Sequence, residues 1–264
     1  RRAWRSGFLN RLAGALNDRG AMAFTDQLPL SLQGSMPATN LALRSVGRPS
    51  LDARQRDLIA AMYRGAPLDA AVREGFSVRA QAEQAFAGEM AKASRGAAPA
   101  RGFEQEARRI ARMMRSSHDL GFVDVGGWDT HVGQGGATGY LAARLGELAR
   151  GLRAYADEMG PDWRRTTVVV LSEFGRTFRE NGNRGTDHGH GSVYWVLGGA
   201  VRGGRIAGEQ QAVTAANLLQ NRDWPVLNDY RALLGGVFAR TYGLKPAQLA
   251  RVFPQAAPRD MGLV

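Results

Sequence analysis

The chain has 264 residues, of which 44% are hydrophobic, enough for one large domain or for one domain with a small appendage. It contains no cysteine, which excludes disulfides and thiolate metal sites, and no apolar run approaches the roughly 20 residues of a membrane-spanning helix. The formal net charge of +11 invites a nucleic-acid interpretation, but only Lys92 and Lys245 are lysines and no recognisable nucleic-acid-binding module accompanies the arginines. The composition therefore favours a globular protein without a specific nucleic-acid partner.

The first half of the chain is predicted to be mainly helical. Residues 4–17 have apolar positions on one face, which is typical of an amphipathic helix. Short extended pieces follow between residues 21 and 46, broken by prolines and glycine. Helices are then predicted at 52–63, 68–94 and 103–116, with a helix-breaking link at 95–101. We therefore expect a single domain over 1–264, with a mainly helical part at 47–118.

From residue 121 onward strands alternate with helices. Short apolar runs predict strands at 121–125, 167–171 and 193–197. Apolar residues at alternating spacings of four and three predict a helix over 140–159, which Gly160 and Pro161 should end. A last helix is predicted at 229–242, capped by Asn228 or Asp229. This alternation predicts a parallel sheet with helices packed on its faces.

Two glycine-flanked clusters follow predicted strands. They read GGWDTH at 126–131 and SEFGRT continuing to GTDHGHG at 172–191. Ligand sites of open α/β sheets lie at the carboxyl ends of the strands, so we expect the two clusters to meet. Their mixed nitrogen and oxygen donors suit Zn²⁺, Mn²⁺ or a similar divalent ion. The candidate metal ligands are Asp129, His131, Glu173, Asp187, His188 and His190.

The same residues allow other interpretations. Residues two apart in an extended chain point the same way, so Asp129 with His131, or His188 with His190, could share one ion. Each pair could equally be structural, and Glu173 could be a turn cap with Arg176 as its ion-pair partner. The hydroxyls of three threonines are either near a reacting group or simply form turns: Thr130, Thr177 and Thr186.

These motifs carry a resemblance to a known family. GGWDTH, SEFGRT, ENGNRGTDHGHG and the later LGGAVRGG resemble the DUF1501 family, over nearly the whole chain from GFLNRL onward. The resemblance implies a relationship to the alkaline phosphatase and sulfatase superfamily. It therefore implies a three-layer α/β/α fold with a mostly parallel central sheet, and a site for one or two metal ions.

The resemblance also suggests roles. Asp129 resembles the aspartate of the first metal in the superfamily, and His188 or His190 resembles its late histidine. Glu173 stands where the aspartate of a strand-end Asp-His pair would be, and Phe174 stands in place of its histidine. Family members usually have a preceding segment, often behind an export signal, with the first core strand and the region of the nucleophile. The resemblance thus implies that this chain starts after that segment and that the protein is periplasmic or exported.

Three functions follow from this reasoning. The first is a divalent-metal-dependent hydrolase of phosphate or sulfate esters of small molecules, in which Arg176 is a catalytic residue that holds a substrate oxygen. The second is a non-catalytic exported binding protein with a degenerate metal site, which Phe174 favours. The third is a nucleic-acid binder, which rests on charge alone. Metal content and turnover distinguish the first two, and salt-sensitive DNA binding distinguishes the third.

Overall fold

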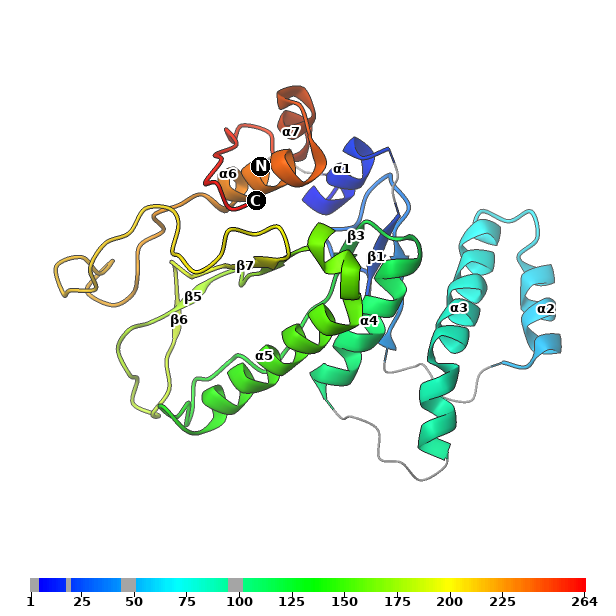
Figure 1. Cartoon of the computed structure of the whole chain (residues 1–264), viewed down its shortest axis with the longest axis horizontal. Coiled ribbons are helices and arrows are strands. Elements are labelled where there is room, and N and C mark those ends of the chain that lie inside the picture. Colours follow the sequence, from blue (N-terminus) through cyan, green and yellow to red (C-terminus); the bar gives the residue numbers. More distant parts are fainter. Residues whose placement is uncertain (1–4, 18–19, 44–50, 95–101) are drawn as a thin grey trace. The chain divides into compact units, whose positions relative to one another are not determined.

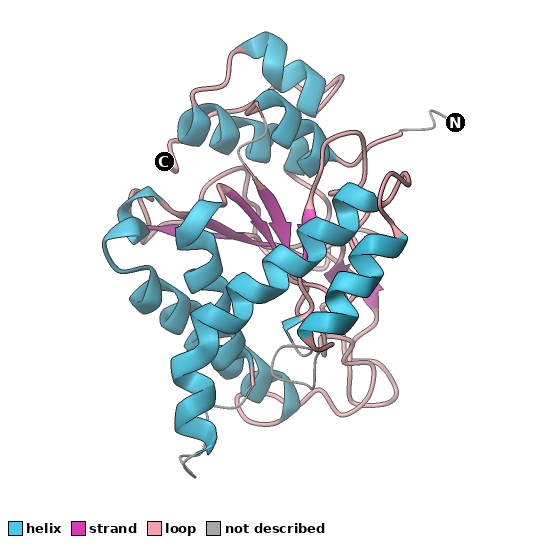
Figure 2. Ribbon diagram, turned by 90° about the vertical axis from the view of Figure 1, so that its right-hand side faces the viewer, coloured by secondary structure: helices cyan, strands magenta, loops and turns pink. Residues whose placement is uncertain are grey.

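The computed structural model describes residues 5–17, 20–43, 51–94 and 102–264, and the predicted link at 95–101 lies outside them. The chain divides into two compact units, residues 1–124 and residues 125–264. The described helices are α1 (Phe8–Ala15), α2 (Ala53–Met62), α3 (Asp69–Ser94), α4 (Phe103–Ser117), α5 (Tyr140–Met159), α6 (Tyr230–Tyr242) and α7 (Pro246–Val252), with the 3₁₀ helix η2 at Gly160–Arg165 (Figure 1). The described strands are β1 (Ala21–Ala23), β2 (Thr39–Asn40), β3 (Leu120–Phe122), β4 (Thr167–Val170), β5 (Gly175–Arg176), β6 (His188–Gly189) and β7 (Trp195–Gly198). Regular structure is mostly helical and the strands are short (Figure 2).

The first unit contains a small parallel sheet. Strand β1 lies in the middle, with Met22 opposite Thr39 of β2 and Ala21 opposite Leu120 of β3. All three residues of β1 are buried, as expected for a parallel strand covered on both faces. The strand predicted at 121–125 is therefore present, but as β3 it begins at Leu120 and ends at Phe122.

Helices complete the core of the first unit. The predicted helices at 52–63, 68–94 and 103–116 correspond to α2, α3 and α4, which lie within this unit. Phe86 of α3 is fully buried, and the Arg109 guanidinium of α4 lies 5.3 Å from the centre of its ring. Asn10 of α1 is buried, and its amide donates hydrogen bonds of 2.8 Å to the carbonyl oxygens of Leu32 and Met36. This asparagine fixes the loop that follows β1 against α1.

Helix α5 of the second unit has the bounds that the leucine spacing predicts. It ends at Met159, and Gly160 and Pro161 begin η2 directly afterwards. Leu148 and Met159 are buried, whereas Leu145 is 39% exposed. The predicted apolar face is thus buried along only part of its length.

Leu148 offers a test of this packing. Leu148→Ala should lower the free energy of unfolding by about 2–5 kcal/mol, because its side chain is only 7% exposed and truncation leaves a cavity. Leu145→Ala on the same helix is the matched control and should cost about 0.5 kcal/mol or less. Urea unfolding of both variants measures the difference, and equal values would place Leu148 outside the core.

The predicted parallel arrangement of the later strands is wrong. Strands β4 and β7 are antiparallel, with Val168 opposite Leu197 and Val170 opposite Trp195. Neither strand has a fully buried residue, so the prediction of doubly covered interior strands fails as well. The segment between them contains the antiparallel pair β5 and β6 in place of a helix. Parallel neighbours need a crossover, which is usually helical, whereas antiparallel strands do not.

The fold is accordingly mixed α/β, with a small three-stranded parallel sheet in the first unit and antiparallel pairs in the second. Helices α6 and α7 build a second apolar cluster, in which the rings of Phe238 and Phe253 stack at 5.9 Å. Asp229, one of the two predicted caps, accepts a hydrogen bond from the backbone N–H of Arg231 at the start of α6. Among the described residues no helix is long and apolar enough to cross a membrane.

Candidate metal centre

Two loops of the second unit lie side by side and carry the candidate residues. The N–H of Thr186 donates to the carbonyl of Thr130 at 3.1 Å, and the N–H of Gln134 donates to the carbonyl of Arg184 at 2.9 Å. The loop after residue 125 is thereby attached to the loop that contains GTDHGHG. The predicted meeting of the two clusters thus arises from direct pairing of loops, because β3 and β4 belong to different sheets.

The short β5–β6 pair fixes His188 within this arrangement. Arg176 of β5 lies opposite His188 of β6, and Gly175 lies opposite Gly189. A Cβ atom on Gly175 would lie 1.8 Å from the carbonyl oxygen of Gly191, so only glycine permits this close approach. The glycines of the motif therefore bring the two strands together and hold His188 beside the first loop.

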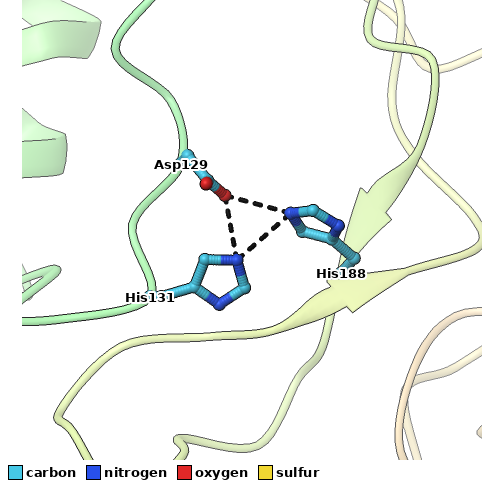
Figure 3. Close-up of side chains that lie close together, drawn as sticks. All are labelled: Asp129, His131 and His188. Carbon is cyan, nitrogen blue, oxygen red and sulfur yellow. Dashed lines mark hydrogen bonds and ion pairs between the residues drawn. The ribbon is translucent and has the colours of Figure 1, made fainter.

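Three side chains converge on one point (Figure 3). Oδ1 of Asp129 lies 3.0 Å from Nε2 of His131 and 3.0 Å from Nε2 of His188, and the two Nε2 atoms are 3.2 Å apart. Asp129 and His131 come from the first loop, and His188 comes from β6. They form a group of donors that could hold a metal ion.

The size of this triangle suits a metal ion. Donors that share one ion at ~2.0–2.1 Å, the usual zinc–nitrogen distance, are about 3 Å apart from one another. The separations of 3.0, 3.0 and 3.2 Å between these three atoms match that spacing, and two imidazole nitrogens with one carboxylate suit Zn²⁺ and Mn²⁺ alike. The side chains of Asp129, His131 and His188 are 68%, 39% and 50% exposed, which leaves room for water or substrate on the ion.

The orientation of His131 is set by a carboxylate on its other nitrogen. Nδ1 lies 3.0 Å from Oδ1 of Asp187. An ionised carboxylate only accepts hydrogen bonds, so with a metal ion on Nε2 the ring would carry its hydrogen on Nδ1 and donate it to Asp187. Asn181 supports this pair by donating to Oδ1 of Asp187 and to the carbonyl of His131, both at 3.0 Å. The hydrogen bonds from Asn181 and His131 lower the pKa of Asp187.

Arg176 contacts Asp129. Its NH1 group donates to Oδ1 of Asp129 at 2.9 Å, while its Nε donates to the hydroxyl of Thr186 at 3.0 Å. The hydroxyl of Thr186 in turn donates to Oε1 of Gln134 at 2.7 Å. Hydrogen bonds from His188 and Arg176 lower the pKa of Asp129, which keeps this carboxylate ionised as a ligand must be. Among the described residues the ion pair of Arg176 is therefore with Asp129, not with Glu173 as the alternative interpretation expected, and Arg176 orients this aspartate.

Phe174 packs beside the third donor. The centres of the Phe174 and His188 rings are 4.2 Å apart, with their planes tilted by 32°. This ring contact supports the orientation of His188.

The remaining predicted ligands lie apart from the triangle. In the part of the chain that the structure describes, the group of potential ligands does not extend to Glu173, Asp187 or His190. Glu173 is exposed, and its charge contributes to raising the pKa of Tyr194, after burial and Tyr230. His190 contacts the buried Asp223, with 2.8 Å between Nδ1 and Oδ2. Burial opposes the ionisation of Asp223, but the hydrogen bonds from His190 and Arg222 outweigh it and lower its pKa.

The three candidate hydroxyls all take part in local hydrogen bonds. Thr130 is buried and donates to Oε1 of Gln134 at 2.7 Å, as Thr186 does. Thr177 is also buried; its hydroxyl donates to the carbonyl of Arg179 and accepts from the N–H of Asp187. These contacts hold the two loops in place, in keeping with the interpretation of the threonines as turn-forming residues.

Sequence reasoning missed three residues that shape the centre. They are Gln134, Asn181 and Asp223, which contact partners 52, 50 and 33 positions away respectively. A single amide or carboxylate far from its partner has no spacing to recognise. The Asn-Gly-Asn run at 181–183 does predict a turn, and Asn181 forms it by accepting from the N–H groups of Asn183 and Gly185.

Comparison with known proteins gives one match. A family model described as "Protein of unknown function (DUF1501)" matches residues 1–253. No curated protein and no solved structure matches the chain.

Proposed function

We propose that this chain, which belongs to the DUF1501 family, binds one divalent metal ion and uses it to hydrolyse phosphate or sulfate esters of small molecules. The observation that carries the proposal is the triangle of Asp129, His131 and His188, with 3.0–3.2 Å between donor atoms and all three side chains partly exposed. Two neutral nitrogens and one carboxylate form a donor set typical of catalytic zinc and of related ions that keep positions open for substrate.

The metal ion would act as a Lewis acid that polarises an ester oxygen and offsets charge in the transition state. The residues around it have separate tasks. Asp187 holds His131 in the tautomer that presents Nε2, and Phe174 holds the His188 ring. Arg176 orients Asp129 and, as a planar cation in contact with this ligand, is suited to bind a second oxygen of a tetrahedral phosphate or sulfate group.

The proposal has three further parts, which follow from the resemblance of the motifs. We propose that the protein is a member of the alkaline phosphatase and sulfatase superfamily, that its fold is a three-layer α/β/α arrangement, and that it is periplasmic or exported. An experimental structure of the protein tests the first two, and cell fractionation with an antibody against the chain tests the third.

The experiment is a paired measurement of metal binding and turnover. Isothermal titration of the metal-free protein with Zn²⁺ and with Mn²⁺ should give one ion per chain. The metal-loaded protein should hydrolyse an aryl phosphate or an aryl sulfate, and a chelator should remove that activity. His188→Ala should lose both properties, and His118→Ala should keep both. Turnover that persists in the chelated protein would contradict the proposal.

A second function is supported by Phe174. Because the ring of Phe174, whose centre lies 4.2 Å from that of His188, supplies no donor atom, the centre also suits a binding protein with a single structural ion. In that case the protein binds zinc and retains phosphate or sulfate on it without turning over either ester.

A further inference from the structure

The side-chain amide of Asn181 uses all of its hydrogen-bonding groups beside the metal centre. Nδ2 donates to the carbonyl oxygen of His131 and to Oδ1 of Asp187, both at 3.0 Å. Oδ1 accepts the backbone N–H groups of Asn183 at 2.9 Å and of Gly185 at 3.1 Å. One amide therefore joins the loop of His131 to the carboxylate that orients this histidine, and replacement of its NH₂ group by oxygen would remove both donors.

The residue after Asn181 favours a chemical change of this amide. Asn181 is the one asparagine of the chain that a glycine follows. In asparagine deamidation the backbone nitrogen of the next residue attacks Cγ, and glycine hinders that approach least because it has no Cβ. Gly182 is exposed, and a Cβ atom there would meet nothing within 4 Å. Among the described residues, no group accepts a hydrogen bond from its N–H.

The surroundings of Oδ1 stabilise this attack. When the Gly182 nitrogen adds to Cγ of Asn181, negative charge develops on Oδ1, which already accepts two backbone N–H groups. Two fixed donors on a developing oxyanion lower the barrier of acyl transfer in enzymes. The bond from the N–H of Asn183 to Oδ1 is also an Asx turn, which holds the side chain against the backbone that follows it.

We propose that Asn181 deamidates in the folded protein and that this modification disables the metal centre. The Gly182 nitrogen forms a bond to Cγ and gives up its proton, the bond from Cγ to Nδ2 breaks, and ammonia leaves with that proton. A water molecule then opens the succinimide and leaves aspartate or isoaspartate in place of asparagine. The loss of the metal rests on the metal binding of the proposed function, whereas the deamidation does not.

The new carboxylate would stand where two hydrogen bonds are now donated. It places an acceptor against the carbonyl oxygen of His131 and a negative charge against the carboxylate of Asp187, both across contacts of 3.0 Å. Like charges at this distance repel, so Asp187 would move away from Nδ1 of His131. Loss of a partner that orients a metal-binding histidine typically costs 10–100-fold in metal affinity.

Mass spectrometry of the aged protein tests the deamidation. Trypsin cleaves after Arg179 and Arg184 and releases both Asn181 and Asn183 on one peptide, so Asn183 is an internal control. After storage in neutral buffer at body temperature, fragmentation should place the mass gain at Asn181. The rate should be about tenfold higher than in a synthetic peptide of the same sequence, which lacks the two fixed donors. Gly182→Ala should retain the asparagine over the same period.

Zinc titration tests the effect on the metal centre. Asn181→Asp should bind Zn²⁺ at least tenfold more weakly than the fresh wild type. Aged wild type should lose affinity in proportion to its deamidated fraction, whereas aged Gly182→Ala should keep the affinity of the fresh protein. Should Asn181→Asp not fold, the deamidated form separated from aged wild type by anion exchange gives the same comparison.

The two steps can fail separately. An intact Asn181 after storage, a mass gain at Asn183 instead, or a rate no higher than in the peptide would overturn the deamidation. Wild-type zinc affinity in Asn181→Asp would overturn the effect on the metal centre. A fresh protein that binds no zinc would refute the proposed function and this effect with it, while the peptide masses would still decide whether Asn181 deamidates.

Discussion

Asp129→Ala should abolish stoichiometric binding of Zn²⁺ and Mn²⁺, with an affinity loss well above 100-fold. Oδ1 of this carboxylate is common to three contacts, with Nε2 of His131, Nε2 of His188 and NH1 of Arg176. Its removal deletes the one anionic donor of the triangle and leaves the Arg176 cation beside two neutral nitrogens, which repels a divalent cation. Competition with a chromogenic zinc chelator measures the loss.

Asp187→Asn is the matched control for that experiment. It removes a carboxylate from the same network, but one that lies on the outer nitrogen of His131. We expect a loss of 10–100-fold, the effect typical of a partner that orients a ligand. An asparagine can still accept from Nδ1, so the ring keeps its orientation in part. If Asp187→Asn loses as much affinity as Asp129→Ala, Asp187 is a direct ligand, as its place in the GTDHGHG motif also allowed.

The helices could be predicted from the sequence because the patterns that indicate them are local. The alternating spacing of Leu141, Leu145, Leu148 and Leu152 defines one face, and Gly160 with Pro161 defines the end of α5. Burial of that face was less predictable, since Leu145 remains 39% exposed and Leu148 only 7%. Which part of an apolar stripe is covered depends on neighbours that come from elsewhere in the chain.

Whether neighbouring strands are parallel or antiparallel could not be predicted from the sequence. An apolar run such as residues 167–171 predicts a strand but carries no information on whether its partner runs with it or against it. The parallel prediction came from the alternation of elements, and it failed because a β5–β6 pair, not a helix, joins β4 to β7. Two-residue strands such as His188–Gly189 are too short to show any period.

The sequence predicted which residues form the candidate metal centre better than it predicted what each of them does. The glycine-flanked histidines and aspartates identified Asp129, His131 and His188, which the structure brings together. Residues two apart in an extended chain point the same way, and Asp129 and His131 do lie in one group. His190, in contrast, contacts Asp223 and does not lie in the group that contains His188. The orientation of His190 is set by the buried carboxylate of Asp223, 33 positions away. No local sequence pattern predicts such a contact.

The last prediction concerns a residue that supplies no ligand atom. Gly185 lies where the two loops meet, and a Cβ atom there would lie 2.2 Å from the carbonyl oxygen of His131 and 2.4 Å from that of Thr130. These are backbone atoms, so they cannot swing away as a flexible side chain would. Gly185→Ala should therefore push the loop of Asp129 and His131 away from the loop that leads to His188. Overpacking of this kind typically costs 1–3 kcal/mol.

Gly182 provides the comparison within the same loop, because a Cβ atom there would meet nothing within 4 Å. Gly182→Ala should keep the zinc affinity and thermal unfolding of the wild type, whereas Gly185→Ala should lose zinc affinity by at least tenfold and unfold at a lower temperature. The loss follows because a shift of a few tenths of an ångström at His131 is a large fraction of the ±0.2 Å tolerance of a ligand bond. Equal zinc affinity in the two variants would mean that the contact between the loops does not set the spacing of Asp129, His131 and His188.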